Sequence, residues 1–141
     1  MIDIDLVRRK LSRLNMYLDK LSPVAKKSLK EYLKEDYVRF STERLIQLIV
    51  ECATDINNHV VVETGHRPPE DYRSSFIKAA ETGLITTQLA AKIQGSAGMR
   101  NIIVHEYMDI DHQLVFKIIP VALRHYREYI KQVNAFLGRT K

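Results

Sequence analysis

The stretch that decides the fold is residues 41–60, STERLIQLIVECATDINNHV. Apolar side chains recur in it at spacings of three and four, which is the pattern of a helix that buries one face. The predicted stripe consists of Leu45, Leu48, Ile49, Cys52, Ile56, His59 and Val60. Ser41 or Thr42 can cap the start of this helix, and Gly65 is expected to end it.

Helical periodicity continues on both sides of this stretch. Before it, we expect one helix with Leu6, Leu11, Leu14, Leu18 and Leu21 on a single face, and a second helix from Ser22 and Pro23 to Phe40, with a break between Asp36 and Ser41. After it, we expect a helix from about Asp71 to Thr82, with its buried face formed by Tyr72, Phe76, Ala79 and Ala80 and its end at Gly83. We also expect a helix from about Thr86 to His105 and a last helical region that opens at residues 109–111. Pro120 either kinks this last region or starts a new helix within it.

Signals for β-strands are weak. The β-branched run Val60-Val61-Val62 continues a helical stripe and has no neighbouring segment with which to form a hairpin. The chain has 141 residues and is 45% hydrophobic, which is usual for a globular domain with one core. We therefore expect residues 1–141 to form a single all-α domain, an antiparallel bundle of about five helices.

Three features bear on the location of the protein. No apolar run approaches the roughly 20 residues that span a bilayer. Residues 1–5 lack the basic and apolar regions of an export signal. Cys52 is the one cysteine, which excludes an intramolecular disulfide and fits a reducing compartment. We therefore expect a cytoplasmic protein with no membrane segment, in which Cys52 is a buried and unreactive thiol.

The net charge of the chain is +5 and is unevenly distributed. Residues 1–40 hold ten Lys and Arg against six Asp and Glu, and residues 124–141 hold five against one. A basic surface attracts polyanions. Many basic domains bind none, however, so the charge alone favours an ordinary solvated surface.

The segment from Arg100 to Tyr107, RNIIVHEY, gathers polar groups at the end of an apolar helix. Asn101 and His105 are four residues apart and share a face, which the long side chain of Arg100 can also reach. Polar groups in a stretch expected to be buried need partners or a function. A permanent cation, an imidazole and a phenol together suit the handling of a phosphodiester. The simpler interpretation is a surface arginine and a histidine favoured by the helix dipole.

A second polar row consists of Arg44, Glu51, Asp55 and Asn58, which share one face of the long helix. This row is either solvated or lines a cleft or dimer interface, where it can position Arg100 through a salt bridge. The histidines and Cys52 lack the spacing of a metal site, so no metal is expected. Residues 95–98 are small but lack the Lys-Ser/Thr of a phosphate loop, and they suggest close approach of another helix, within the chain or across a dimer.

The residues Arg100 to Tyr107 resemble the Arg-x4-His-x-Tyr signature of HEPN-domain ribonuclease toxins, specifically of the HepT family. Residues 43–48, 58–59, 65–73 and 97–101 are also similar to HepT sequences in order and spacing, so the resemblance covers about residues 3–136. It implies an all-α HEPN bundle that forms a homodimer in which the two motifs face one cleft. It also implies a partner, a minimal nucleotidyltransferase antitoxin of the MntA type.

By this resemblance the chain is expected to be a metal-independent endoribonuclease that requires no cofactor. The ribose 2′-hydroxyl would attack the adjacent phosphorus with His105 as general base or acid. Arg100 would stabilise the charge that builds on the phosphoryl oxygens, with Asn101 in support. Tyr107 would accept AMP from the partner, which would place negative charge in the RNA cleft and silence the toxin.

Two other interpretations stay open on the sequence. In the first, the chain is a non-catalytic helical module that binds a nucleotidyltransferase and presents a nucleotide substrate to it. In the second, the chain is a dimeric scaffold whose motif is only structural. Replacing His105 by Ala distinguishes these two interpretations from the ribonuclease. An enzyme would lose activity, a binding module would keep most of its affinity, and a scaffold would lose stability.

Overall fold

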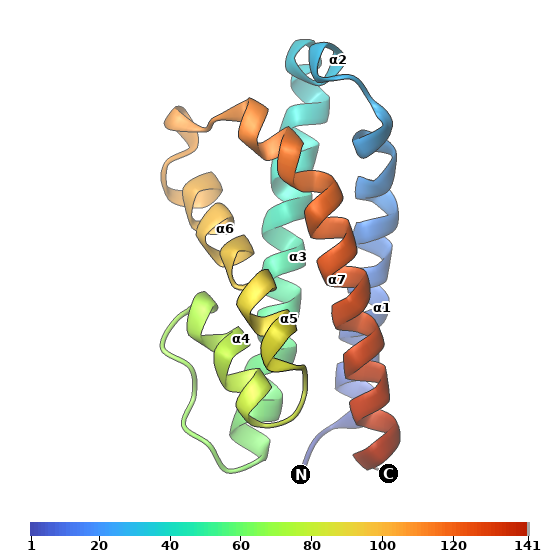
Figure 1. Ribbon diagram of the computed structural model, residues 1–141, viewed down its shortest axis with the longest axis vertical. Helices are drawn as coiled ribbons and strands as arrows, with labels where there is room; N and C mark the ends of the chain where they lie inside the picture. Colours follow the sequence, from blue (N-terminus) through green and yellow to red (C-terminus); the bar gives the residue numbers. More distant parts are fainter. Residues whose placement is uncertain (141) are drawn as a thin grey trace.

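The computed structural model describes residues 1–140, and these form an all-α domain without a strand (Figure 1). The α-helices are α1 (Ile4–Leu21), α2 (Leu29–Lys34), α3 (Asp36–Glu63), α4 (Tyr72–Glu81), α5 (Thr87–Ile93), α6 (Gly95–His105) and α7 (His112–Thr140). Two 3₁₀-helices, η1 (Ser22–Lys26) and η2 (Tyr107–Asp109), lie in the connections. The predicted all-α class is confirmed.

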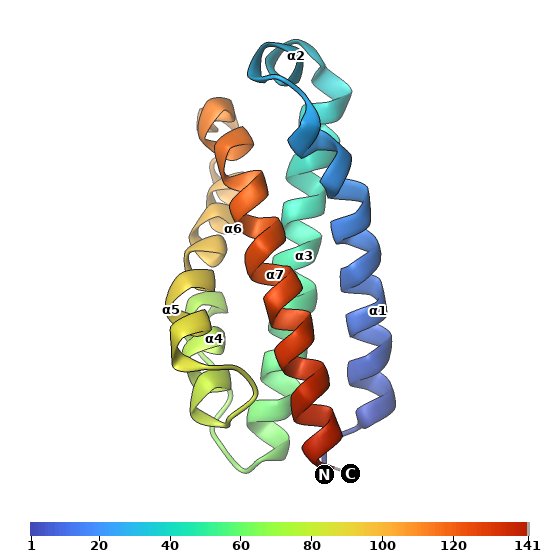
Figure 2. The same ribbon diagram turned by 45° about the vertical axis from the view of Figure 1, so that its right-hand side comes forward.

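The three long helices α1, α3 and α7 lie side by side along the longest axis of the molecule (Figures 1 and 2). The shorter helices α4, α5 and α6 cover one side of this layer, and the two chain ends meet at the same end of the bundle. α1 runs antiparallel to α3, whereas α7 runs parallel to α3 because α4 to α6 carry the chain back along the bundle. None of the helices in residues 1–140 is long and apolar enough to cross a membrane.

Apolar stripes at helical spacing build the core. The stripe of α1 is buried at Val7, Leu11, Leu14, Leu18 and Leu21, and that of α7 at Val115, Ile119, Tyr126, Tyr129, Val133 and Leu137. In the predicted stripe of α3, Ile49, Cys52, Ile56 and Val60 are buried, while Leu45, Leu48 and His59 are half-buried. The buried face of α3 is wider than one stripe because α1 packs on one side of it and α4 and α6 on another.

Two helix starts differ from the sequence prediction. α3 begins at Asp36 rather than at residue 41 or 42, and Thr42 is buried inside it instead of capping it. The predicted helix from Ser22 to Phe40 is divided, because Ser28 caps α2 through a capping box with Glu31. A capping box satisfies two otherwise unpaired backbone groups, so it sets a new helix start there.

The predicted helix from Thr86 to His105 is also divided, into α5 and α6, with Gln94 between them. The small residues at this point accommodate a neighbour, since a Cβ added to Gly98 would lie 2.9 Å from Nη2 of Arg73 on α4. The expected helix ends at Gly65 and Gly83 are confirmed by left-handed φ values of 86° and 85°. Pro120 lies inside α7, which continues through it.

Candidate active-site cleft

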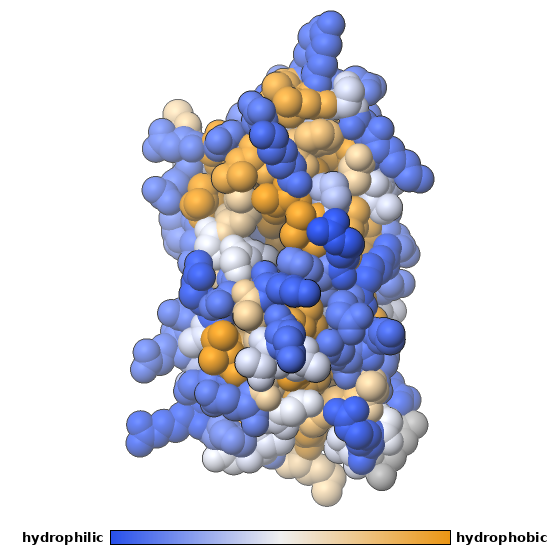
Figure 3. Space-filling view, viewed as in Figure 1, coloured by the Kyte–Doolittle hydropathy of each residue, from blue (hydrophilic) through white to orange (hydrophobic). Residues whose placement is uncertain are grey.

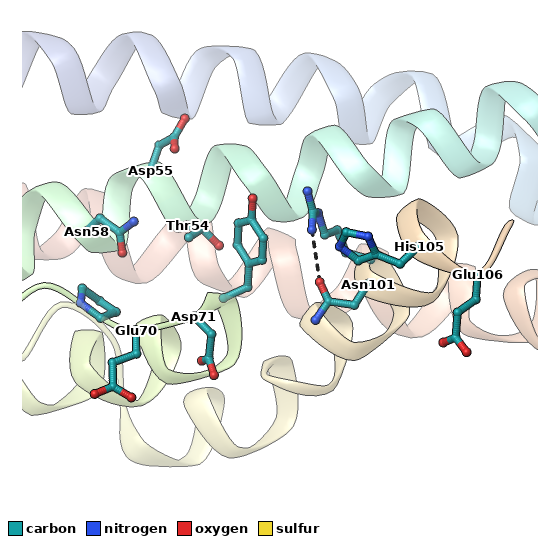
Figure 4. A pocket seen from close by; sticks show the side chains of 11 residues that line it. Thr54, Asp55, Asn58, Glu70, Asp71, Asn101, His105 and Glu106 are labelled. Carbon is teal, nitrogen blue, oxygen red and sulfur yellow. Dashed lines mark hydrogen bonds between the residues drawn. The ribbon is translucent and has the colours of Figure 1, made fainter.

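A cleft of about 630 Å³ opens between α3, α6 and the start of α4 (Figure 4). Its lining residues are Thr54, Asp55 and Asn58 from α3, Pro69, Glu70, Asp71 and Tyr72 from the segment that leads into α4, and Arg100, Asn101, His105 and Glu106 from the end of α6. Three segments that are distant in the sequence therefore meet at one concave surface. Arg100, Asn101 and His105, predicted to cluster by their helical spacing, are all part of it.

The pattern of α6 explains why these three side chains face the cleft. Ala97 and Ile103 are buried and hold the helix against α3 and α4. The opposite side of α6 carries Asn101 and His105, which are both exposed and lie next to each other in Figure 4. His105 is the last residue of the helix, so its imidazole lies at the negative end of the helix dipole.

Arg100 is the most extensively bonded side chain of the cleft and is only 12% exposed. Its Nε and Nη2 both donate to Oε2 of Glu51, at 3.1 and 2.8 Å, and its Nη1 donates to Oδ1 of Asn101 at 3.1 Å. A guanidinium has five N–H donors in a rigid fork, so two of them remain for another ligand. Arg100 is therefore fixed in orientation while it keeps the capacity to bind an oxyanion.

Glu51 and Tyr72 hold the guanidinium of Arg100 from two directions. Glu51 comes from α3, and its Oε2 also accepts a hydrogen bond from Nε2 of Gln47 at 3.1 Å. The ring of Tyr72 lies under the guanidinium, with 4.2 Å between Cζ of Arg100 and the ring centre. Such cation–π contacts contribute about 0.5–2 kcal/mol, depending on how far the cation is desolvated.

The second polar row is not one structural unit. Glu51 forms the salt bridge to Arg100, and Asp55 lines the cleft while it pairs with Lys10 at 2.9 Å. Asn58 lines the cleft as well, and its Oδ1 is buried with no hydrogen-bond partner among the described residues. Arg44 is exposed, lies outside the cleft and forms no ion pair within residues 1–140. Asp55 and Asn58 therefore line the cleft, Glu51 supports it through Arg100, and Arg44 takes no part.

A buried polar network fixes the start of α4 beneath the cleft. The Tyr129 hydroxyl donates to Oδ1 of Asn57 at 2.5 Å, and Nδ2 of Asn57 donates to Oγ of Ser75 at 3.2 Å. Ser75 Oγ in turn donates to the backbone carbonyl of Tyr72 at 2.7 Å. The network joins α7, α3 and α4, and sequence analysis missed it because its members have no local pattern.

Carboxylates dominate the rim of the cleft. Asp55, Glu70, Asp71 and Glu106 line it, whereas Arg100 is its one permanent cation among the described residues. Asp71 also caps α4, and its hydrogen bonds from the backbone and side chain of Ser74 lower its pKa. The cleft is therefore not electropositive as a whole.

Tyr107 and His105 differ in their relation to the cleft. His105 lines it and forms no hydrogen bond to any of residues 1–140. Tyr107, two residues later in η2, lies outside the lining and is 67% exposed, and the neighbouring Met108 is 81% exposed. Tyr107 is thus accessible, and it directly follows Glu106, which lines the cleft.

Cys52 and His59 lie outside the lining of the cleft. Cys52 is buried as predicted, and burial raises the pKa of its thiol to about 11. Nε2 of His59 accepts a hydrogen bond from the backbone of Asp3 at 2.9 Å. Within residues 1–140, no three His, Cys, Asp or Glu side chains are grouped in a way that could hold a metal ion.

Comparison with known proteins places this chain in a family. Residues 14–133 match the family described as Ribonuclease HepT-like. The chain is 36% identical over 132 residues, 94% of its length, to the tRNA nuclease HepT of Aphanizomenon flos-aquae, of which it covers 90%. It is 29% identical over 90 residues, 64% of its length, to the mRNA nuclease HepT of Shewanella oneidensis, of which it covers 68%.

A solved structure with the same fold is that of the tri-AMPylated HEPN toxin of Shewanella oneidensis in complex with its MNT antitoxin. The TM-score is 0.84 at 23% identity, over 93% of this chain and 98% of that one.

Proposed function

The chain belongs to the family of HepT-like ribonucleases, and from this membership we propose that it cleaves RNA with Arg100 and His105 and without a metal ion. The observation that carries the proposal is that Arg100, held by Glu51, Asn101 and Tyr72, lies in the same cleft as an exposed imidazole. An oriented cation and a free acid–base group are the two components that transfer of a phosphodiester to a neighbouring hydroxyl requires.

In the proposed reaction, the 2′-hydroxyl of RNA attacks the adjacent phosphorus while an imidazole accepts its proton. The bond from phosphorus to the 5′-oxygen breaks, and that oxygen takes a proton as it leaves. The two remaining N–H donors of Arg100 bind the phosphoryl oxygens, on which negative charge increases in the transition state. The products are a 2′,3′-cyclic phosphate and a 5′-hydroxyl.

We assign the second proton transfer to a second copy of the chain. His105 has no orienting partner among residues 1–140, and the side chains of Tyr107 and Met108 beside it are largely exposed. Large exposed apolar side chains at one place are typical of an interaction surface. A homodimer that covers this end of α6 brings two imidazoles to one cleft, so one acts as base and the other as acid.

We propose that the protein is the toxin of a pair whose antitoxin is an MntA-type nucleotidyltransferase, and that the antitoxin transfers AMP to Tyr107. Tyr107 is exposed and directly follows Glu106, which lines the cleft, so a transferase can reach it. An attached adenylate places a phosphate close to Arg100, competes with the RNA phosphate and adds like charge to a rim that already holds four carboxylates. All of these effects weaken RNA binding.

The experiment that tests this proposal is cleavage of a mixed cellular RNA pool in EDTA by the wild type and by His105→Ala, with the intact mass of each protein measured first. The proposal predicts cleavage by the unmodified wild type alone. Equal cleavage by both proteins would exclude a role for His105, and activity that disappears in EDTA would exclude a metal-independent reaction. A folded, unmodified wild type that binds RNA without cutting it would make the chain a binding module.

A further inference from the structure

The cleft cannot by itself attract a polyanion strongly. Its rim holds the carboxylates of Asp55, Glu70, Asp71 and Glu106, and its one arginine is already paired with Glu51. Binding of RNA draws most of its free energy from cations that neutralise phosphates. If RNA is the substrate, as proposed above, that free energy must come from another surface of the molecule.

The exposed face of α7 carries a row of cations with few carboxylates near them. This helix contains Lys117, Arg124, Arg127, Lys131 and Arg139, and Glu128 is its one acidic residue. Arg127 is paired with Asp19, but Lys117, Arg124 and Lys131 are exposed and form no ion pair within residues 1–140. They are spaced by seven residues, so they lie on one side of α7, about 10 Å apart in a row about 21 Å long.

Lys92 on α5 extends this row sideways. It is exposed, and with Arg124, His125, Gln132 and the acidic Glu128 it lines a groove of about 650 Å³ between α5 and α7. Burial of His125 and the nearby charges of Arg124 and Lys92 lower the pKa of its imidazole.

Other basic parts of the chain contain more carboxylates for each cation, since residues 1–40 hold ten Lys and Arg against six Asp and Glu. Lys27 pairs with Glu35, and the lysines around α2 alternate with Glu31, Glu35 and Asp36. Lys10 on α1 pairs with Asp55, and Asp5 and Asp19 lie on the same helix as its other cations. We define the α7 basic face as Lys92, Lys117, Arg124 and Lys131.

The composition of this face favours nucleic acid over protein. Lys and Arg on long side chains, with no aromatic side chain along the grooves at Arg124 and Lys131, suit phosphates rather than bases. Figure 3 shows mostly hydrophilic side chains along the lower part of α7 and an apolar area around the start of α7 near α2. A protein partner would use that apolar area first.

We propose that the α7 basic face is a docking surface for the phosphate backbone of RNA, which supplies affinity while the cleft supplies the chemistry. No residue of α7 lines the cleft, and in Figure 4 α7 passes behind α3 as seen from the cleft. An RNA that uses both surfaces must therefore reach around the bundle. A folded RNA or a long strand therefore binds more tightly because of the α7 basic face, whereas a short oligonucleotide in the cleft does not reach that face.

The test compares Lys117→Ala/Arg124→Ala/Lys131→Ala with a control of equal charge change, Lys20→Ala/Lys30→Ala/Lys34→Ala, whose positions are also exposed and unpaired among the described residues. Bulk tRNA and an oligoribonucleotide of about five nucleotides are the two substrates. For tRNA, we expect the α7 variant to raise KM about tenfold or more with kcat unchanged. The slope of log affinity against log salt falls by about two. For the short substrate, all three proteins behave alike.

The same substitutions in a His105→Ala background, with tRNA binding measured by fluorescence anisotropy, keep this proposal separate from the proposed chemistry. If the wild type cleaves nothing but the α7 substitutions still weaken tRNA binding, the chemistry fails and the docking surface stands. If the control variant lost as much tRNA affinity as the α7 variant, the effect would be one of net charge, and the proposal would be overturned. An α7 variant that binds tRNA as tightly as the wild type would also overturn the proposal, even if the variant had lost binding to a protein partner.

Discussion

Two nitrogens of Arg100, Nε and Nη2, donate to the same oxygen of Glu51, Oε2, across a separation of 49 residues. This contact joins α6 to α3 and fixes the direction in which the remaining N–H donors of Arg100 point. A charge-assisted pair of hydrogen bonds of this kind is stronger and more directional than a neutral one. Glu51 is therefore a positioning residue in the proposed mechanism, and Arg100 and His105 are the residues that contact RNA.

Glu51→Gln tests this positioning role. The amide keeps the size of the side chain but removes its charge, so Arg100 becomes free to turn out of its place. We expect kcat to fall about tenfold to a hundredfold, because small displacements of a catalytic group have effects of that size. The free energy of unfolding should fall by about 1–2 kcal/mol. Single-turnover cleavage and urea unfolding measure the two effects.

Glu70→Gln is the matched control, since Glu70 lines the same cleft without an ion pair to Arg100. It should change the free energy of unfolding by less than about 0.5 kcal/mol. Glu51→Gln with unaltered kcat would show that Arg100 needs no support from α3.

Tyr72 is tested by a pair of substitutions that separate its ring from its hydroxyl. Tyr72→Phe keeps the aromatic face under Arg100, and we expect its cleavage rate to stay within about twofold of the wild type. Tyr72→Leu removes that face and should lower the rate about tenfold, the equivalent of about 1.4 kcal/mol. Equal rates for the two variants would contradict a cation–π role.

The buried network predicts that Tyr129→Phe is costly. It removes the donor to Oδ1 of Asn57, and a buried acceptor without a partner costs about 1–3 kcal/mol of unfolding free energy. Tyr126→Phe is the comparison. Its hydroxyl lies 2.6 Å from Oγ of Ser96, which also bonds to the carbonyl of Ile93, so we expect a loss of about 1 kcal/mol or less. Equal losses in urea unfolding would argue against the network.

Cys52 gives a prediction about pH. Burial raises the pKa of its thiol from 9.0 to about 11, so the protonated form favours the folded state. This contribution is complete below pH 9 and is lost as the pH rises toward 11. The stability of the wild type should therefore fall more steeply over this range than that of Cys52→Ala, as measured by thermal unfolding. Native protein at pH 8 should also resist a thiol reagent that labels it in urea.

The helical class and the convergence of Arg100, Asn101 and His105 could be predicted because both follow from local spacing. Buried positions at intervals of three and four mark the helices, and residues four apart on one helix share a face. The ends at Gly65 and Gly83 could be predicted for the same local reason, since glycine adopts a left-handed φ readily.

The rest of the cleft depends on contacts between distant segments. Tyr72 was expected only to pack its ring in the core, and nothing in its neighbourhood indicates that the ring supports Arg100. The link from Tyr129 to Asn57 spans 72 residues. α3 starts at Asp36 and α6 starts at Gly95 without a side-chain cap, and apolar periodicity does not report such starts.

The chemistry of the cut ends tests the central claim most directly. Unmodified wild-type protein is incubated with a mixed RNA pool in EDTA, and the new ends are identified by their reactivity with phosphatase, kinase and ligase. The account predicts 2′,3′-cyclic phosphate and 5′-hydroxyl ends that are absent when Arg100→Ala or His105→Ala replaces the wild type. New 3′-hydroxyl and 5′-phosphate ends would contradict it, because they require attack by water rather than by the 2′-hydroxyl of RNA.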